Sequence, residues 1–295
     1  MDNASRLNGK SANDKSVSAS SNPAHATTAA GCGIAFMAKA SAPGRAKTRL
    51  VPPLTFEEAA VLNTAFLRDV ADNVLLAARD CDRPSSGIAG YAAYGPPGSE
   101  DFFRRTLPGG IGLIEAWRQN FGDCLLHTIE EIFARGHASA VVLNSDSPTL
   151  PTAFLVETAA ALARPGDRAV LGPSSDGGYY LLGLKAVHRH MFETIAWSTE
   201  QVAKQTLERA REIGLDVHRL PVWYDVDDVE GLRRLRAELS DRQESLDRQA
   251  AERSRLEKHQ PRYAANTAVL MNSLHRNHDF NRRAAALFEA EPLRA

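Results

Sequence analysis

Four aspartates stand at positions where their carboxylates could act together. Asp146 lies in N-S-D-S-P-T-L-P, directly after an apolar run, and Asp176 precedes two glycines in L-G-P-S-S-D-G-G-Y-Y-L-L-G-L. Asp225 and Asp227 follow in D-V-D-D. Carboxylates packed together repel one another unless they share a cation, so a divalent metal is their natural partner.

Three cationic side chains lie nearer the start of the chain. Arg45, Lys47 and Arg49 alternate in A-P-G-R-A-K-T-R-L, after an apolar run. Cations beside a glycine at the end of a buried strand are typical of phosphate sites in α/β proteins. A solvated basic loop is the alternative, and the spacing of a Walker A motif is absent.

Each acid also has a purely structural interpretation. The Asp-Gly pair at Asp176 is typical of a tight hairpin turn. Asp146 fits a turn or a helix cap equally well, and either Asp227 or Asp228 is expected to cap a helix that starts near Val229. The individual motifs leave both interpretations open.

The order of the predicted elements brings these residues together. Apolar runs at Gly33 to Lys39 and Ala138 to Leu143 predict buried strands, and Arg168 to Leu184 predicts a strand, a glycine turn and a second strand. Strands and helices alternate from Gly33 to Leu239, which predicts an α/β fold with a mostly parallel sheet and helices on both faces. The strand-end residues should then gather along one edge of the sheet.

The helix predicted over Thr55 to Arg79 has the clearest local signals. Thr55 and Glu58 form a capping box. A stripe at helical spacing, which we expect to face the core, contains Phe56, Ala59, Asn63, Phe66, Val70 and Val74.

Composition narrows the class of partner. The 35 Lys and Arg against 36 Asp and Glu give a net charge of -1, which argues against nucleic acid or a membrane surface as partner. No apolar run approaches the roughly 18 residues that span a bilayer. Three scattered cysteines and a polar start without an apolar signal segment favour a cytoplasmic protein.

Three regions are expected along the chain. Residues 1–30 are predicted to be a disordered tail, 31–239 a nucleotide-binding catalytic domain, and 240–295 a helical extension. Within the extension, Tyr263 to Leu274 and Phe280 to Leu287 predict weak amphipathic helices. A partner surface, a cover for the domain and disorder all remain open as its role.

Five motifs together resemble a known family. In order they are A-P-G-R-A-K-T-R-L, N-S-D-S-P-T-L-P, L-G-P-S-S-D-G-G-Y-Y-L-L-G-L, W-S-T and D-V-D-D. Over about Gly33 to Leu239 the chain resembles the GT-A-like transferases often encoded near radical-SAM and selenoprotein-domain genes, commonly described as arsenosugar-type glycosyltransferases. More distantly it resembles phospholactate guanylyltransferases and molybdopterin nucleotidyltransferases. The resemblance implies the Rossmann-like GT-A fold of nucleotide-diphospho-sugar transferases, with a nucleotide-linked substrate and Mg²⁺ or Mn²⁺.

The resemblance also implies roles for individual residues. The candidates are Asp146 and Asp176 for catalysis, Arg45, Lys47, Arg49, Gly177, Gly178 and Tyr179 for substrate binding, and Asp146, Asp225 and Asp227 for the metal. Two motifs depart from related families. The strand-end acid is D-S-P where many glycosyltransferases have D-x-D, and the first loop lacks the glycine-rich stretch of most nucleotidyltransferases.

The second departure favours transfer of a sugar. The leading hypothesis is a metal-dependent glycosyltransferase that moves a sugar from a nucleotide-sugar to a small acceptor. The first alternative is a nucleotidyltransferase that joins a nucleoside triphosphate to a small phosphorylated acid and releases pyrophosphate. The second alternative is a non-catalytic nucleotide-binding or interaction module.

Overall fold

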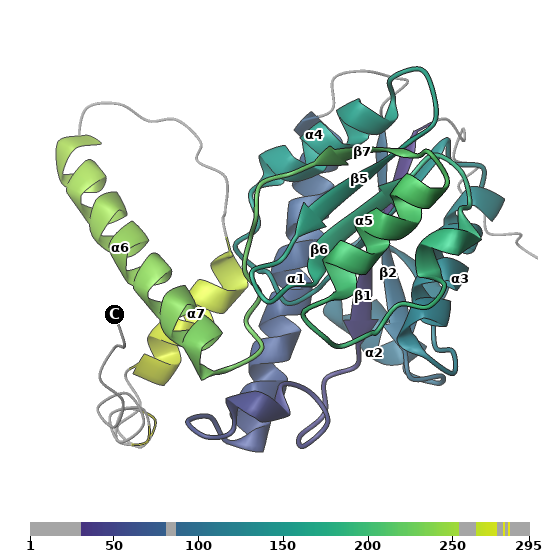
Figure 1. The fold of residues 1–295 in the computed structure, drawn as a ribbon. Coiled ribbons are helices and arrows are strands. Elements are labelled where there is room, and N and C mark those ends of the chain that lie inside the picture. Colours follow the sequence, from purple (N-terminus) through teal and green to yellow (C-terminus); the bar gives the residue numbers. More distant parts are fainter. Residues whose placement is uncertain (1–30, 81–86, 254–263, 276–279, 281–282, 284–295) are drawn as a thin grey trace, which may run out of the picture.

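The computed structural model describes residues 31–80, 87–253, 264–275, 280 and 283 (Figure 1). The predicted tail 1–30 and most of the helix predicted at Phe280 to Leu287 lie outside these residues. The seven strands are β1 (Cys32–Lys39), β2 (Ile88–Gly95), β3 (Gly112–Glu115), β4 (Ser139–Leu143), β5 (Arg168–Pro173), β6 (Tyr179–Leu184) and β7 (Asp216–Arg219). The helices are α1 (Phe56–Asp80), α2 (Glu100–Thr106), α3 (Phe121–Ala134), α4 (Thr152–Leu162), α5 (Val202–Glu212), α6 (Val229–Arg253) and α7 (Ala265–His275), with short 3₁₀ helices η1 (Thr48–Leu50) and η3 (Arg189–Phe192).

All seven strands form one sheet in the order β3-β2-β1-β4-β6-β5-β7. Parallel pairs join β1 to β2 and β4, β2 to β3, and β5 to β7. Strand β6 is the exception, since it runs antiparallel to both β4 and β5. The predicted α/β fold with a mostly parallel sheet is confirmed.

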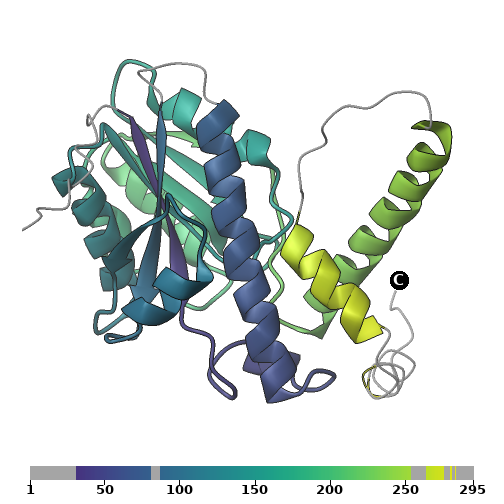
Figure 2. The same cartoon turned by 180° about the vertical axis from the view of Figure 1, so that it is seen from behind.

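Helices cover both faces of the sheet (Figures 1 and 2). On one face, α1, α2 and α4 pack on apolar side chains of the strands, with Phe36, Val141 and Val170 among the buried sheet residues. On the other face, α3, α5 and η3 pack on a second set that includes Ala35 and Val142. Because successive side chains of a strand point to opposite faces, a strand buried on both sides must be apolar along its buried length, as β1 is before Lys39 and β4 is after Ser139.

Helix α1 follows most of its sequence signals. The backbone N–H of Thr55 donates to Glu58 Oε2 at 2.8 Å and that of Glu58 to Thr55 Oγ1 at 3.1 Å, which confirms the capping box. The stripe is buried except at its first member, because Phe56 is 47% exposed. The prediction of a core position for Phe56 is therefore wrong. It precedes the point where α1 meets the sheet.

The C-terminal helices pack on the domain. Helix α6 runs through the expected boundary at 239/240 without a break, so the three-region division stays a prediction. A third apolar core contains residues of α1 and η1 together with Leu232 and Leu235 of α6 and Met271 and Leu274 of α7. In the described part of the chain, no helix combines the length and apolar character needed to span a membrane.

Candidate functional site

The predicted site residues follow the ends of four strands that point the same way. Strand β4 is parallel to β1. It is antiparallel to β6, which is antiparallel to β5, and β5 is parallel to β7. The loops after β1, β4, β5 and β7 therefore leave the same edge of the sheet. These loops carry the three cations, Asp146, Asp176 and the Asp225 to Asp227 stretch respectively.

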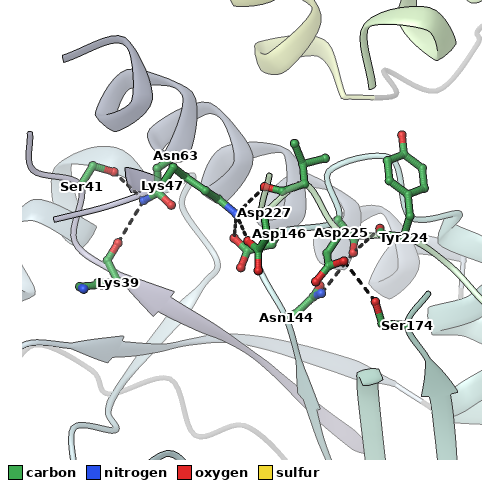
Figure 3. A network of polar contacts seen from close by, with 12 residues as sticks. Lys39, Ser41, Lys47, Asn63, Asn144, Asp146, Ser174, Tyr224, Asp225 and Asp227 are labelled. Carbon is green, nitrogen blue, oxygen red and sulfur yellow. Dashed lines mark hydrogen bonds and ion pairs between the residues drawn. The ribbon is translucent and has the colours of Figure 1, made fainter. Parts of the chain in front are cut away.

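Lys47 lies at the centre of this edge (Figure 3). Its Nζ is 2.5 Å from Asp146 Oδ1 and 2.8 Å from Asp227 Oδ1, and it donates to the Val226 carbonyl at 2.9 Å. The Lys47 side chain is 5% exposed, and its Nζ lies 5.3 Å from the centre of the Phe66 ring. One ammonium group thus joins the loops after β1, β4 and β7.

The protonation of this cluster follows from burial and charge. Burial alone would lower the pKa of Lys47, but attraction to Asp146 and Asp227 outweighs it and raises the pKa. Burial raises the pKa of Asp227, yet attraction to Lys47 and, less strongly, Arg49 brings it below its usual value. For Asp146, burial raises the pKa, Lys47 opposes the rise and Asp227 adds to it, and the pKa remains raised. One cation therefore neutralises the two carboxylates incompletely.

Asp225 directly precedes Val226, but its carboxylate points away from Lys47 (Figure 3). Its Oδ1 accepts a hydrogen bond from Ser174 Oγ at 3.3 Å (Figure 3). Burial, followed by repulsion from Asp176 and Asp227, raises the pKa of Asp225 to about 6. Ser174 is held in place because the next residue donates its N–H to the Trp223 carbonyl at 2.9 Å.

The turn between β5 and β6 supports the hairpin interpretation of Asp176. The Asp176 carboxylate accepts from the backbone N–H of Gly178 at 2.9 Å, as an Asx turn does. Gly177 has φ +90, and a Cβ there would lie 2.2 Å from the Glu200 carbonyl oxygen. The glycine is thus required by close packing on the chain before α5. Asp176 nevertheless acts on the site, since its charge raises the pKa of Asp225.

A cavity of about 470 Å³ opens beside the Lys47 cluster. All three predicted cations, Tyr179, Asp146 and Asp227 line it. Arg45 and Arg49 are exposed, whereas Lys47 is buried. Two cations are therefore available to a ligand, and the third already binds carboxylates.

Four other predicted residues do not line this cavity: Asp176, Gly177, Gly178 and Asp225. Gly177 lines a separate cavity beside α5, and Gly178 lies in the Asx turn.

Asp228 Oδ1 accepts from the backbone N–H of Gly231 at 2.8 Å, which confirms the expected cap at the start of α6.

The carboxylates fit a divalent cation in their chemistry. Within the described ranges, no group of three or more histidine, cysteine, aspartate or glutamate side chains is placed closely enough to hold a metal ion. Yet Asp146 and Asp227 share one ammonium group, whereas Asp225 accepts a hydrogen bond from Ser174. Burial and then repulsion from Asp176 and Asp227 raise the pKa of Asp225. Carboxylate oxygens are the ligands that Mg²⁺ and Mn²⁺ prefer. A metal bound beside Asp225 would relieve this repulsion.

Sequence reasoning missed several residues of the site. Asn63 lines the cavity and donates from Nδ2 to Ser41 Oγ at 2.8 Å and to the Lys39 carbonyl at 3.2 Å, which ties α1 to the loop after β1. A polar residue within the apolar stripe of α1 is the signal that could have found it. Trp117 and Phe121, both about half-exposed at the cavity, carry no such signal.

Known proteins share this fold. Residues 84–199 match the profile of the family described as "Uncharacterized protein conserved in bacteria (DUF2064)". This segment contains Asp146 and the D-G-G turn but neither the cation loop nor D-V-D-D. Among curated proteins, none matches the sequence.

Three solved structures illustrate the likeness. A protein from Desulfovibrio desulfuricans G20, itself provisionally assigned as a nucleotide-diphospho-sugar transferase, aligns with a TM-score of 0.66 and 24% identity over 86% of this chain and 98% of its own. A 4-diphosphocytidyl-2C-methyl-D-erythritol synthase from Anaerococcus prevotii DSM 20548 aligns with a TM-score of 0.46 and 11% identity over 72% and 99%. The mannosyltransferase PcManGT from Pyrobaculum calidifontis, solved with GDP-Man and Mn²⁺, gives 0.39 and 14% over 91% and 78%.

The first of these alignments carries the conclusion about architecture. It spans most of both chains. The protein has the Rossmann-like GT-A fold of nucleotide-diphospho-sugar transferases, with residues 84–199 matching the DUF2064 family.

Proposed function

We propose that this protein is a metal-dependent glycosyltransferase that moves a sugar from a nucleotide-sugar to a small acceptor. The observation that carries the proposal is the meeting of exposed cations and clustered carboxylates around one cavity at the carboxyl edge of the sheet. Ligands of open α/β sheets bind outside this edge. The cavity is of the size that holds a small molecule, roughly 300–1,000 Å³.

The cationic and the acidic side chains of the site would bind different parts of the ligand. Arg45 and Arg49 would bind the diphosphate of the donor, since guanidinium groups pair well with phosphate oxygens. Asp225 and Asp227, with Asp146, would hold Mg²⁺ or Mn²⁺. When bound, such a metal stabilises the charge that grows on a leaving phosphate. Lys47 keeps Asp146 and Asp227 in place, and Tyr179 and Asp176 would help to shape the acceptor side.

The alternative is a nucleotidyltransferase, which would use the same charges on a nucleoside triphosphate. The two reactions differ in their products, because only nucleotidyl transfer releases pyrophosphate. An assay for pyrophosphate therefore separates them once an acceptor has been found.

The first test is a thermal-shift panel of nucleotide-sugars and nucleoside triphosphates, each with and without Mg²⁺ or Mn²⁺. A ligand at a hundred times its Kd stabilises a protein by about 2.7 kcal/mol. We expect a nucleotide-sugar to stabilise the wild type only with metal, and Asp146→Asn to lose the effect. Asp216→Asn is the matched control, because Asp216 is exposed at the opposite end of β7.

Each other outcome changes the assignment. Stabilisation by a triphosphate alone would favour nucleotidyl transfer. Equal stabilisation of the wild type and Asp146→Asn would contradict the proposed metal site. If none of the nucleotides binds, the result favours a non-catalytic interaction module over both transferases.

A further inference from the structure

We propose that the C-terminal segment around α7 is a positioning part of the site, which fixes the turn at residues 48–58 and through it the cation loop. This proposal deepens the proposed function and rests on it only for the identity of the ligand. Three sets of contacts carry it: a buried carboxylate, a shared apolar core and an arginine at the turn. All three join α7, Phe280 or Arg283 to the first quarter of the chain.

The first contact is a carboxylate of α1 at the start of α7. Asp69 is 4% exposed and accepts from the backbone N–H groups of Asn266 at 2.9 Å and Thr267 at 2.7 Å. The Asn266 side chain adds a third hydrogen bond at 2.9 Å. The first N–H groups of a helix have no partner within the helix, and an anion there also interacts favourably with its dipole. Asp69 thus anchors α7 on α1, and Figure 2 shows the two helices side by side.

The second contact is apolar and reaches the site itself. Met271 and Leu274 of α7 and Phe280 share one buried core with Leu50, Leu54 and Phe66. Leu50 is the last residue of η1, which directly follows Lys47. The ring of Phe66 contacts the Lys47 ammonium group. Helix α7 therefore shares a buried core with the apolar residues that directly follow the cation loop.

The third contact holds the end of the same turn. Arg283 donates from Nε to the Pro53 carbonyl at 2.7 Å and from Nη2 to Glu58 Oε2 at 2.7 Å. That same Glu58 oxygen accepts from the Thr55 N–H in the capping box of α1. Arg283 thus joins the turn to the first residues of α1.

The acidic side of the site shares this support. Tyr224 and Val226 belong to the same apolar core. The Val226 carbonyl accepts from Lys47 Nζ, and the Val226 N–H donates to the Asp146 carbonyl at 2.8 Å. Helix α7 thus shares a core with residues next to both the cations and the carboxylates of the site. The helix itself lies outside residues 84–199, the segment that matches DUF2064.

The test measures hydrogen–deuterium exchange in the full-length protein. Amides of residues 50, 51 and 54 are hydrogen-bonded within the turn and should exchange slowly. In Asp69→Asn and Arg283→Gln, we expect faster exchange across 48–58 while β1 and β4 keep their protection. Arg283→Lys should restore part of it. Val269→Ala is the matched control, because Val269 lies on α7 and is 71% exposed.

A second readout separates positioning from general stability. We expect affinity for inorganic diphosphate to fall about tenfold in Arg283→Gln, the loss of roughly one charge-assisted hydrogen bond at a misplaced cation. A purely stabilising role would lower Tm and leave the diphosphate Kd unchanged.

Unchanged exchange at 48–58, exchange that rises equally over the whole sheet, or an unchanged diphosphate Kd in Arg283→Gln would each overturn the proposal. If Asp69→Asn does not fold, Arg283→Gln alone tests the proposal. The Arg283 side chain is partly exposed, so we expect this variant to fold. Local loosening in a protein whose wild type does not bind diphosphate would support the positioning role and count against the proposed function.

Discussion

Two groups of carboxylates lie at the same edge of the sheet, and they differ in charge balance. Asp146 and Asp227 share the buried ammonium group of Lys47. Asp225 has Ser174 as its hydrogen-bond donor and Asp176 as a repelling neighbour. The pKa of Asp227 is accordingly lowered and that of Asp225 is raised to about 6.

The difference shows how one motif can serve two purposes. In D-V-D-D, Asp227 pairs with Lys47, Asp228 caps α6, and Asp225 accepts a hydrogen bond from Ser174. A carboxylate that already has a buried cation contributes to architecture. One without a cation is available to a metal, and this makes Asp225 the sharper candidate for metal binding.

The largest effect is expected from Lys47→Met, which leaves Asp146 and Asp227 without their shared cation. Removing one partner of a fully buried pair costs roughly 3–5 kcal/mol; because both carboxylates are partly exposed, we expect about 2–3 kcal/mol. Urea unfolding measures the loss. Lys39→Met is the control, since Lys39 is exposed and lines the same cavity. Equal stability of both variants would show that the cluster is not structural.

Removal of the ligand-facing cations should affect binding and leave stability unchanged. For Arg45→Gln and Arg49→Gln, we expect about tenfold weaker binding of a nucleotide-sugar for each, as exposed charge-assisted hydrogen bonds to phosphate are lost. Isothermal titration calorimetry measures the change. Arg164→Gln, an exposed arginine near the start of β5, is the control. Undiminished affinity in the double variant would place the phosphates elsewhere.

Asp225→Asn should stabilise the protein in the presence of a chelator. The folded-state pKa of about 6 lies above the unfolded value of 3.8, so the ionised group destabilises the fold. This penalty is absent below about pH 4 and complete above about pH 6, so the variant's advantage should appear over that window and reach about 1 kcal/mol. Tm measured against pH tests it, and a variant that is less stable at neutral pH would contradict the proposed repulsion.

The same substitution should abolish stabilisation by the metal. Mg²⁺ or Mn²⁺ should raise the Tm of the wild type more above pH 6 than below, because Asp225 must lose its proton to bind. In Asp225→Asn the rise should disappear. Identical metal titrations of the two proteins would exclude Asp225 as a ligand.

The smallest effect is expected from Asp176→Asn. This change removes one repelling charge and keeps an oxygen that can accept the Gly178 N–H. The pKa of Asp225 should move down toward its usual value but stay raised, because burial is the larger cause. Carboxyl NMR titration of Asp225 measures the shift. An unchanged midpoint would show that the two carboxylates do not interact.

Much of the architecture could be predicted from local pattern. Apolar runs predicted β1 and β4, and the capping box and stripe predicted α1, because burial and helix geometry act over a few neighbouring residues. The alternation of strands and helices predicted that Asp146 and Asp227 would reach the same edge. The exposure of Phe56 was missed because periodicity does not show where a helix passes beyond the sheet.

The sequence by itself determined which charges exist and which strand ends carry them. Only the tertiary structure decided their partners: that Lys47 is buried on carboxylates while Arg45 and Arg49 remain exposed, and that Gly177 serves packing. It also decided that Asp69 binds the start of α7 through two hydrogen bonds, whose partners lie 197 and 198 positions further along the chain. The physical reason is that burial and Coulomb energy depend on distances in space, which neither composition nor spacing along the chain specifies.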